Sequence, residues 1–172
     1  YKSTSFDFRY YKKLKMFIHA EQMFEHDDME DGDLTVFLRF GSDLTDNYYE
    51  YEVPLKFTKW YTSSTRDTEI WPDENYIKID FEKLVEVKNN RNKSLGTNNV
   101  QSNRVYSEYD SDGKKKIKVL GNPTISEVRS MMIGVRNPKK DGEVGLDKSA
   151  IVWVNELRLT ELKNKGGWAA TG

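Results

Sequence analysis

Residues 149–159 read SAIVWVNELRL, and this stretch decides the fold that we predict for the chain. Its side chains alternate in character, and β-branched and aromatic residues are frequent, a pattern typical of a β-strand. One face carries the indole and both leucines, whereas the other ends in Glu156 and Arg158. We therefore expect the core face to consist of Ile151, Trp153, Asn155, Leu157 and Leu159.

Asn155 is the polar member of this predicted core face. A buried amide costs free energy unless its donors and acceptors are paired. We therefore expect Asn155 to tie down a neighbouring loop, and we expect the strand to need partner strands.

Composition limits the classes of protein that fit. The chain has 172 residues, enough for one domain with one core. Lys and Arg number 27 and Asp and Glu 28, which gives no support for nucleic-acid binding. No apolar run is long enough for a membrane helix, so we expect this piece not to span a membrane itself. Because the sequence begins with Tyr1, we expect an internal piece of a longer protein.

Strand patterns recur upstream of residues 149–159. We expect an edge strand within 1–11, and further strands at 12–20, 34–40, 48–57, 76–80, 104–109, 115–120 and 130–135, the last of them buried. Pro54 lacks a donor for the ladder, so its strand is expected at an edge or with a bulge. Gly134 leaves room for a neighbouring group to pack closely against it.

A single short helix is predicted after the strand at 76–80. Asp80 is a candidate cap for a helix from Phe81 to about Val87. The stretch 89–103 is rich in Asn, Lys and Ser and indicates a flexible loop. About eight strands, one short helix and long polar loops predict a mostly β fold, an antiparallel β-sandwich of jelly-roll type that forms one domain over 1–172.

Sequence motifs for catalysis are not found. The chain has no nucleophile elbow, phosphate-binding loop, dinucleotide fingerprint or zinc spacing, so we predict a non-enzyme with no cofactor and no metal. The acidic run 27–33, DDMEDGD, departs from a calcium-binding loop, because Met29 and Leu38 occupy positions that need oxygen ligands. We expect an exposed turn there.

Three aromatic residues in the irregular stretch 59–75 are the candidate contact residues: Trp60, Tyr61 and Trp71. Exposed aromatic side chains on a loop of a sandwich can stack on sugar rings. Indoles also commonly close the end of a sandwich core, and this second interpretation is the more frequent one. No residue is a candidate for catalysis.

Three segments together resemble one family. They are FRYYKKLKMFIHAE at 8–21, DGDLTVFLRFGSD followed by NYYEYEVPL within 31–55, and MIGVRN at 132–137 followed by VWVNELRLTELKNKGGWAATG. The NELR strand followed by GGWAA is the most specific element. The chain resembles the SprA family, very large outer-membrane proteins of the Bacteroidetes type IX secretion system that are also linked to gliding motility.

The resemblance implies a non-catalytic soluble module of the outer-membrane translocon, in the periplasm or at the cell surface. The implied partners are the remainder of the SprA translocon, a PorV-type accessory barrel, a plug protein and secreted cargo, without nucleic acid. It also implies that the tail leads into a further element, so we expect raised mobility after about Lys163, Trp168 included.

Two other functions stay open. The first is a carbohydrate-binding jelly roll, with Trp60, Tyr61 and Trp71 as the stacking platform. Many such modules carry an acidic calcium ligand near an equivalent late strand, where this chain has Asn155 flanked by Glu156. The second is a hydrolase of unrecognised type, which would require strongly perturbed carboxylates in a cleft.

Overall fold

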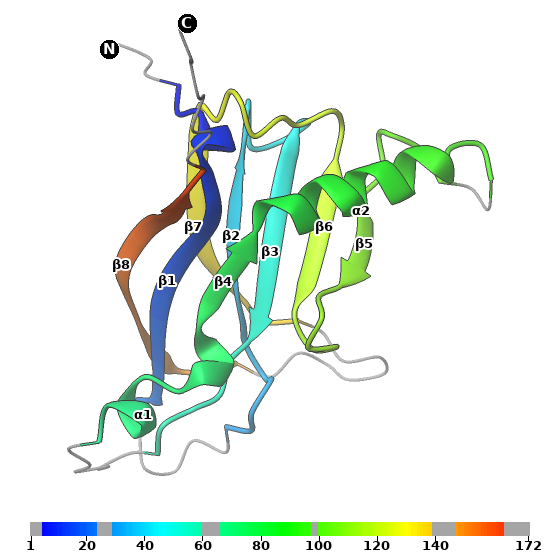
Figure 1. Ribbon diagram of the computed structural model, residues 1–172. Coiled ribbons are helices and arrows are strands. Elements are labelled where there is room, and N and C mark those ends of the chain that lie inside the picture. The colour runs from blue at the N-terminus through cyan, green and yellow to red at the C-terminus, as the bar shows by residue number, and fades with distance from the viewer. Residues whose placement is uncertain (1–4, 24–28, 60–65, 98–99, 139–146, 164–172) are drawn as a thin grey trace, which may run out of the picture.

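The computed structural model describes residues 5–23, 29–59, 66–97, 100–138 and 147–163 and has two layers (Figure 1). The strands are β1 (Tyr11–Gln22), β2 (Thr35–Gly41), β3 (Tyr48–Pro54), β4 (Ile77–Asp80), β5 (Tyr106–Tyr109), β6 (Lys116–Leu120), β7 (Ser130–Arg136) and β8 (Ala150–Leu162). The helical segments are α1 (Asp67–Ile70), α2 (Phe81–Lys93) and the 3-10 turns η1 (Phe8–Tyr10) and η2 (Asp73–Asn75). The expected mobility after Lys163 concerns residues outside this described part.

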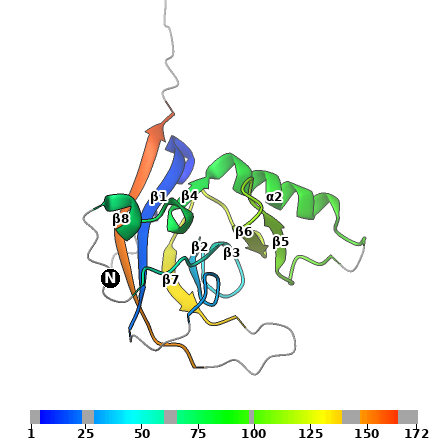
Figure 2. The same ribbon diagram turned by 90° about the horizontal axis from the view of Figure 1, so that it is seen from below.

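Both sheets are antiparallel. The larger has the order β5-β6-β3-β2-β7, and the smaller has the order β4-β1-β8. Helix α2 continues from β4 and, together with the smaller sheet, covers one face of the larger sheet (Figure 2). The predicted mostly β, antiparallel sandwich is confirmed. The jelly-roll type is not confirmed, because a jelly roll has eight strands in two Greek keys, whereas a helix completes the smaller layer here.

The core lies between these layers and follows the alternation of the strands. In β1 the core residues are Leu14, Met16, Ile18 and Ala20, and in β2 they are Val36, Leu38 and Phe40. Phe8 of η1 joins both layers, since its ring centroid lies 5.3 Å from that of Phe81 in α2 and 5.8 Å from that of Phe40. Apolar positions of period two in the strands therefore meet apolar positions of the helix.

Two expectations about strand ends are wrong. Among the described residues before β1, Phe6 forms a single antiparallel bridge with Val128, and the turn η1 then replaces the expected edge strand, because the side chain of Asp7 accepts a hydrogen bond from the backbone N–H of Arg9 at 3.0 Å. Pro54 belongs to an interior strand, since β3 lies between β6 and β2. It is the last residue of that strand, so its missing donor does not interrupt the ladder.

Helix α2 is longer than expected. The predicted cap is confirmed, since Asp80 accepts a hydrogen bond from the Glu82 N–H at 2.9 Å. The helix then continues to Lys93, through the first part of the stretch that was expected to be a loop. Its buried residues are Phe81, Leu84, Val87 and Arg91. The Asn and Lys residues that suggested a loop belong to the polar face that a surface helix presents to water.

The side chain of Asn75 pairs with the backbone of Lys56, just after the end of β3. Its buried side chain accepts a hydrogen bond from Lys56 N at 2.7 Å and donates one to Lys56 O at 2.8 Å. We expect Asn75→Ala to lower the free energy of unfolding by about 2 kcal/mol, because both groups of Lys56 lose their partner. Urea denaturation measures this change. Asn103→Ala is the control at an exposed position, and an equal, small loss in both variants would contradict the prediction.

Candidate functional site

Strand β8 changes the face on which its side chains lie. Its pairing with β1 places Val152 and Val154 opposite buried residues, so both point toward the core. The register then shifts, and Leu159 lies opposite Leu14. Glu156 lies at this shift with a φ of 55°, as in a β-bulge. Because a shift of one residue moves all later side chains to the other face, even-numbered residues face the core before the bulge and odd-numbered residues after it.

Because of the bulge, the core face of β8 differs from the predicted one. Leu157 and Leu159 lie on the core side as expected, whereas Ile151, Trp153 and Asn155 lie on the outer side. Trp153 is 60% exposed. Asn155 is exposed as well, so the expectation of a buried amide that ties down a loop is wrong.

Apolar side chains remain uncovered along β7 and β8, which are edge strands of the two sheets. Within the described residues, β8 pairs with β1 alone and β7 with β2 alone. The large exposed apolar residues on the two strands are Ile133, Val135, Trp153, Val154, Leu157 and Leu162. The expectation of a buried strand at 130–135 is therefore wrong, because β7 lies at an edge that the smaller layer covers only in part.

A cleft of about 330 Å³ opens beside these edges, and we call it the edge cleft. Strand β8 contributes Leu157 and Leu159, and β7 contributes Met131. The other apolar residues of the lining are Phe6, Phe8, Leu14 and Val128. Leu157 lines the cleft and is itself about half exposed, and Val154 lies on the same, core-facing side of β8.

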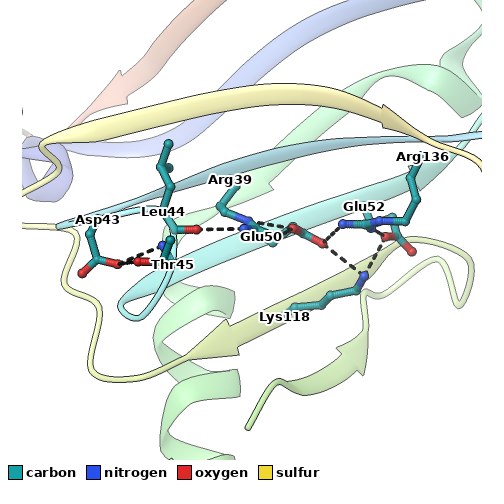
Figure 3. A network of polar contacts seen from close by, with 8 residues as sticks. All are labelled: Arg39, Asp43, Leu44, Thr45, Glu50, Glu52, Lys118 and Arg136. Carbon is teal, nitrogen blue, oxygen red and sulfur yellow. Dashed lines mark hydrogen bonds and ion pairs between the residues drawn. The ribbon is translucent and has the colours of Figure 1, made fainter. Parts of the chain in front are cut away.

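An ion-pair network on the outer face of the larger sheet links β7 to its neighbours (Figure 3). Glu50 of β3 lies 2.6 Å from a guanidinium nitrogen of Arg39 in β2, and 3.1 Å from nitrogens of both Lys118 in β6 and Arg136 in β7. Glu52 of β3 pairs with Lys118 at 2.6 Å and contacts Arg136. The side chain of Glu50 is only 1% exposed, so this outer face holds a buried carboxylate between three cations.

Aromatic rings support the same network. The guanidinium of Arg39 lies 3.9 Å from the ring centroid of Tyr48, and that of Arg136 lies 4.5 Å from the ring of Phe37. A Cβ on Gly134 would lie 2.6 Å from the Phe37 ring, which confirms the close packing expected at this glycine. Arg136 and Gly134 therefore hold the edge strand β7 in a fixed position on the sheet.

Trp71 lies on the outer face of the smaller sheet instead of closing the end of the core. Its ring centroid lies 6.2 Å from that of Phe17, nearly edge-on, and 5.7 Å from that of His19. His19 Nδ1 lies 2.5 Å from the carbonyl oxygen of Ile70, which ties the α1 turn to β1. The turn and the indole are therefore fixed relative to the sheet.

A pocket of about 390 Å³ lies beside Trp71, and we call it the outer pocket. Its lining consists of Phe17, Asp67, Thr68, Trp71, Asp73, Asn155 and Glu156. The structure thus brings together Trp71 and Asn155, two residues that the sequence analysis singled out in distant stretches. The other two candidate residues, Trp60 and Tyr61, lie outside the described residues.

Phe17, Asp67 and Asp73 of the outer pocket were not among the residues predicted from the sequence. The charged network around Glu50 was not predicted either. A signal for the network exists, since its charged residues occupy the outward positions of neighbouring strands. No comparable signal marks Asp67 and Asp73, because only the fold brings these two residues to β8.

Among the described residues, no group of three or more His, Cys, Asp or Glu is arranged to hold a metal ion. In the acidic run, Asp33 is buried and pairs with Lys148 at 2.7 Å, which differs from the fully exposed turn that we expected. None of the described helices has the length and apolar character that crossing a membrane requires.

The fold and these surfaces define a mostly β, two-layer sandwich whose strand β8 pairs on one side only within the described residues. The chain belongs to the SprA N-terminal family, described as motility related/secretion protein, whose model matches residues 1–172, the whole chain. The predicted resemblance is confirmed, and the family description supports a role in secretion or motility. A search of curated proteins found no match.

Proposed function

We propose that this chain is a non-catalytic module of a type IX secretion system outer-membrane translocon. Its role is structural, through protein contacts, in protein export across the outer membrane and in gliding motility. The family match supports the link to secretion and motility. In this proposal residues 1–172 act as one domain, in the periplasm or at the cell surface. Its partners are the remainder of the translocon, a PorV-type accessory barrel, a plug protein and secreted cargo.

The observation that carries the proposal is the uncovered edge of β8. An edge strand presents unpaired backbone N–H and C=O groups that can add a further strand. Strand β8 has 13 residues and, in the described part of the chain, pairs on one side only. Trp153, Val154, Leu157 and Leu162 of β8 are 48% to 60% exposed, which is unfavourable unless a partner covers them.

The partner contributes an extended segment with apolar side chains at alternate positions. Pairing with the backbone of β8 supplies the hydrogen bonds, and alternate side chains of the segment fill the edge cleft. Leu157 of the smaller sheet and Met131 of the larger sheet both line that cleft, so a side chain inserted there meets both sheets. Because the network around Glu50 fixes β7, the partner meets a preformed wall.

A photo-reactive residue at Val154, placed in the intact parent protein, is expected to cross-link to other components of the secretion machinery or to cargo. Val85 on α2 is the matched control, because it is also a valine and is 39% exposed, against 48% for Val154. Cross-links at Val154 and none at Val85 would support the proposal. Equal yields at both positions, or cross-links at Val154 to no secretion component, would contradict it.

A further inference from the structure

The outer pocket lies on the opposite side of β8 from the edge cleft, and a strand added to the edge would not account for it. Phe17 of β1 lies directly opposite Asn155 of β8, so these two residues form the part of the pocket that lies on the sheet. Asp67 of α1 and Asp73 of η2 line it from the connection between β3 and β4. The pocket is thus assembled from three separate parts of the chain.

Aromatic rings give this pocket a wall that favours a cation. Phe17 is held by Tyr76, whose ring stacks on it with a centroid separation of 4.8 Å, and by Trp71, which meets it at 70°. A guanidinium or ammonium group within about 6 Å of a ring centroid is attracted by the negative face of the ring. The chain supplies one such cation itself, since the guanidinium of Arg158 lies 5.4 Å from the ring centroid of Phe17.

The described lining of the pocket is also negatively charged, which favours a cation. Among the described residues of the lining, Asp67, Asp73 and Glu156 carry carboxylates and none carries a cation. Glu156 lies 3.4 Å from Arg158, so one carboxylate is already paired. Within the described residues, no ion pair involves Asp67 or Asp73. Arg158 therefore contacts the ring of Phe17 and the carboxylate of Glu156. Trp71, Asp67 and Asp73 offer the same kinds of contact to a second cation.

We infer that the outer pocket binds a basic side chain, the guanidinium or ammonium group of an arginine or lysine in a partner polypeptide. The cation lies against Trp71 and pairs with Asp67 and Asp73. Asn155 and Thr68 remain available for the backbone of the same segment. This inference deepens the proposed function and rests on it for the polypeptide nature of the partner.

A neutral sugar fits this lining less well. A neutral sugar could hydrogen-bond to the carboxylates, to Asn155 and to Thr68, but it would bring no positive charge to the carboxylates. Binding of a glycan in place of a basic peptide is therefore an outcome that the experiment must distinguish.

The test is a titration of the full chain with a short blocked peptide that contains one arginine. Binding is monitored through the backbone amide resonances of Phe17 and Asn155. A peptide with glutamine in place of arginine is the matched probe. We expect saturable shifts at both residues with the arginine peptide, and none with the glutamine peptide. Affinity should fall between about 0.02 M and about 0.5 M salt, because exposed ion pairs are screened over that range.

The variant Asp67→Asn/Asp73→Asn should weaken arginine binding about fivefold, since two exposed ion pairs together contribute on the order of 1 kcal/mol. Glu86→Gln on α2 removes an exposed carboxylate elsewhere and should leave binding unchanged. Unchanged resonances away from the pocket report that each variant is folded.

Three results would overturn the inference: equal shifts with the glutamine peptide, affinity that does not depend on salt, or shifts with a neutral oligosaccharide but not with the arginine peptide. If any of these occurs while Val154 still cross-links to the secretion machinery, this inference fails and the proposed function stands. If the arginine peptide binds but Val154 gives no such cross-links, the proposed function fails and the pocket remains a site for basic side chains.

Discussion

Replacing Glu50 by glutamine is expected to lower the free energy of unfolding by about 3 kcal/mol, because removal of one partner from a buried ion pair leaves the remaining charges uncompensated. Glu50 is the carboxylate on which Arg39, Lys118 and Arg136 converge. These cations are partly exposed, so we expect a loss at the low end of the range for buried pairs. Urea denaturation at neutral pH measures the change.

Glu127→Gln is the matched control for this substitution. Glu127 also pairs with an arginine, Arg129, but both side chains are about half exposed, so its loss should be below about 1 kcal/mol. A similar loss in both variants would show that burial of Glu50 between its cations adds nothing, which would contradict the prediction.

The dependence on pH gives a second readout for Glu50. Burial alone raises the pKa of this carboxyl, but hydrogen bonds and charges from Arg39, Lys118 and Arg136 together outweigh burial and hold the pKa below its usual value. A group with a lowered pKa in the folded state stabilises the protein above its unfolded pKa and loses this contribution as the pH falls through the folded pKa. The difference between the parent and Glu50→Gln should therefore be constant near neutral pH and shrink below about pH 4.3.

Gly121→Ala is expected to lower the free energy of unfolding by about 3 to 5 kcal/mol, from backbone strain together with a steric clash. Gly121 has a φ of 66°, and a Cβ there would lie 1.9 Å from the carbonyl oxygen of Asp46. The turn that carries Asp46 is held in place, because Asp43 accepts hydrogen bonds from the backbone N–H groups of Thr45, Asp46 and Asn47. The backbone at Asp46 therefore cannot easily move away from the added Cβ.

Gly113→Ala separates the two causes. Gly113 has a φ of 69°, nearly the same as Gly121, but a Cβ there would have no neighbour within 4 Å. This control should therefore show only the strain, about 1 kcal/mol. Thermal and urea denaturation of both variants measure the difference, and equal losses would show that Gly121 and Asp46 are not in close contact.

Gly121 also connects the two layers at this end of the sandwich. Its carbonyl oxygen accepts a hydrogen bond from the buried Arg91 of α2 at 2.6 Å, and its N–H donates to Ser102 at 2.9 Å. The following residue, Asn122, donates its N–H to the side chain of Asn47 at 2.9 Å. A shift of Gly121 would therefore weaken the contacts of the helix and of the turn together, which adds to the expected loss of stability.

The sequence by itself determined the fold class and the family, because both depend on local patterns. Period-two alternation identified the principal strands, among them Tyr48–Pro54 and Ala150–Leu162, and Asp80 marked the start of the helix. Side-chain alternation is a property of the strand itself, so it can be read without knowledge of the partner strand. The ordered segments that resemble SprA proteins likewise need no structure.

The tertiary structure alone decided which side chains of β8 face the core and which residues form the outer pocket. The bulge at Glu156 depends on the register with β1. Without it Trp153 and Leu157 would share a face, and the one additional residue places Trp153 on the outer side and Leu157 on the core side. Buried Glu50 and the pairing of Phe17 with Asn155 depend in the same way on which strands are neighbours. Register and strand order arise from contacts between distant parts of the chain, and a local pattern in one strand carries no information about them.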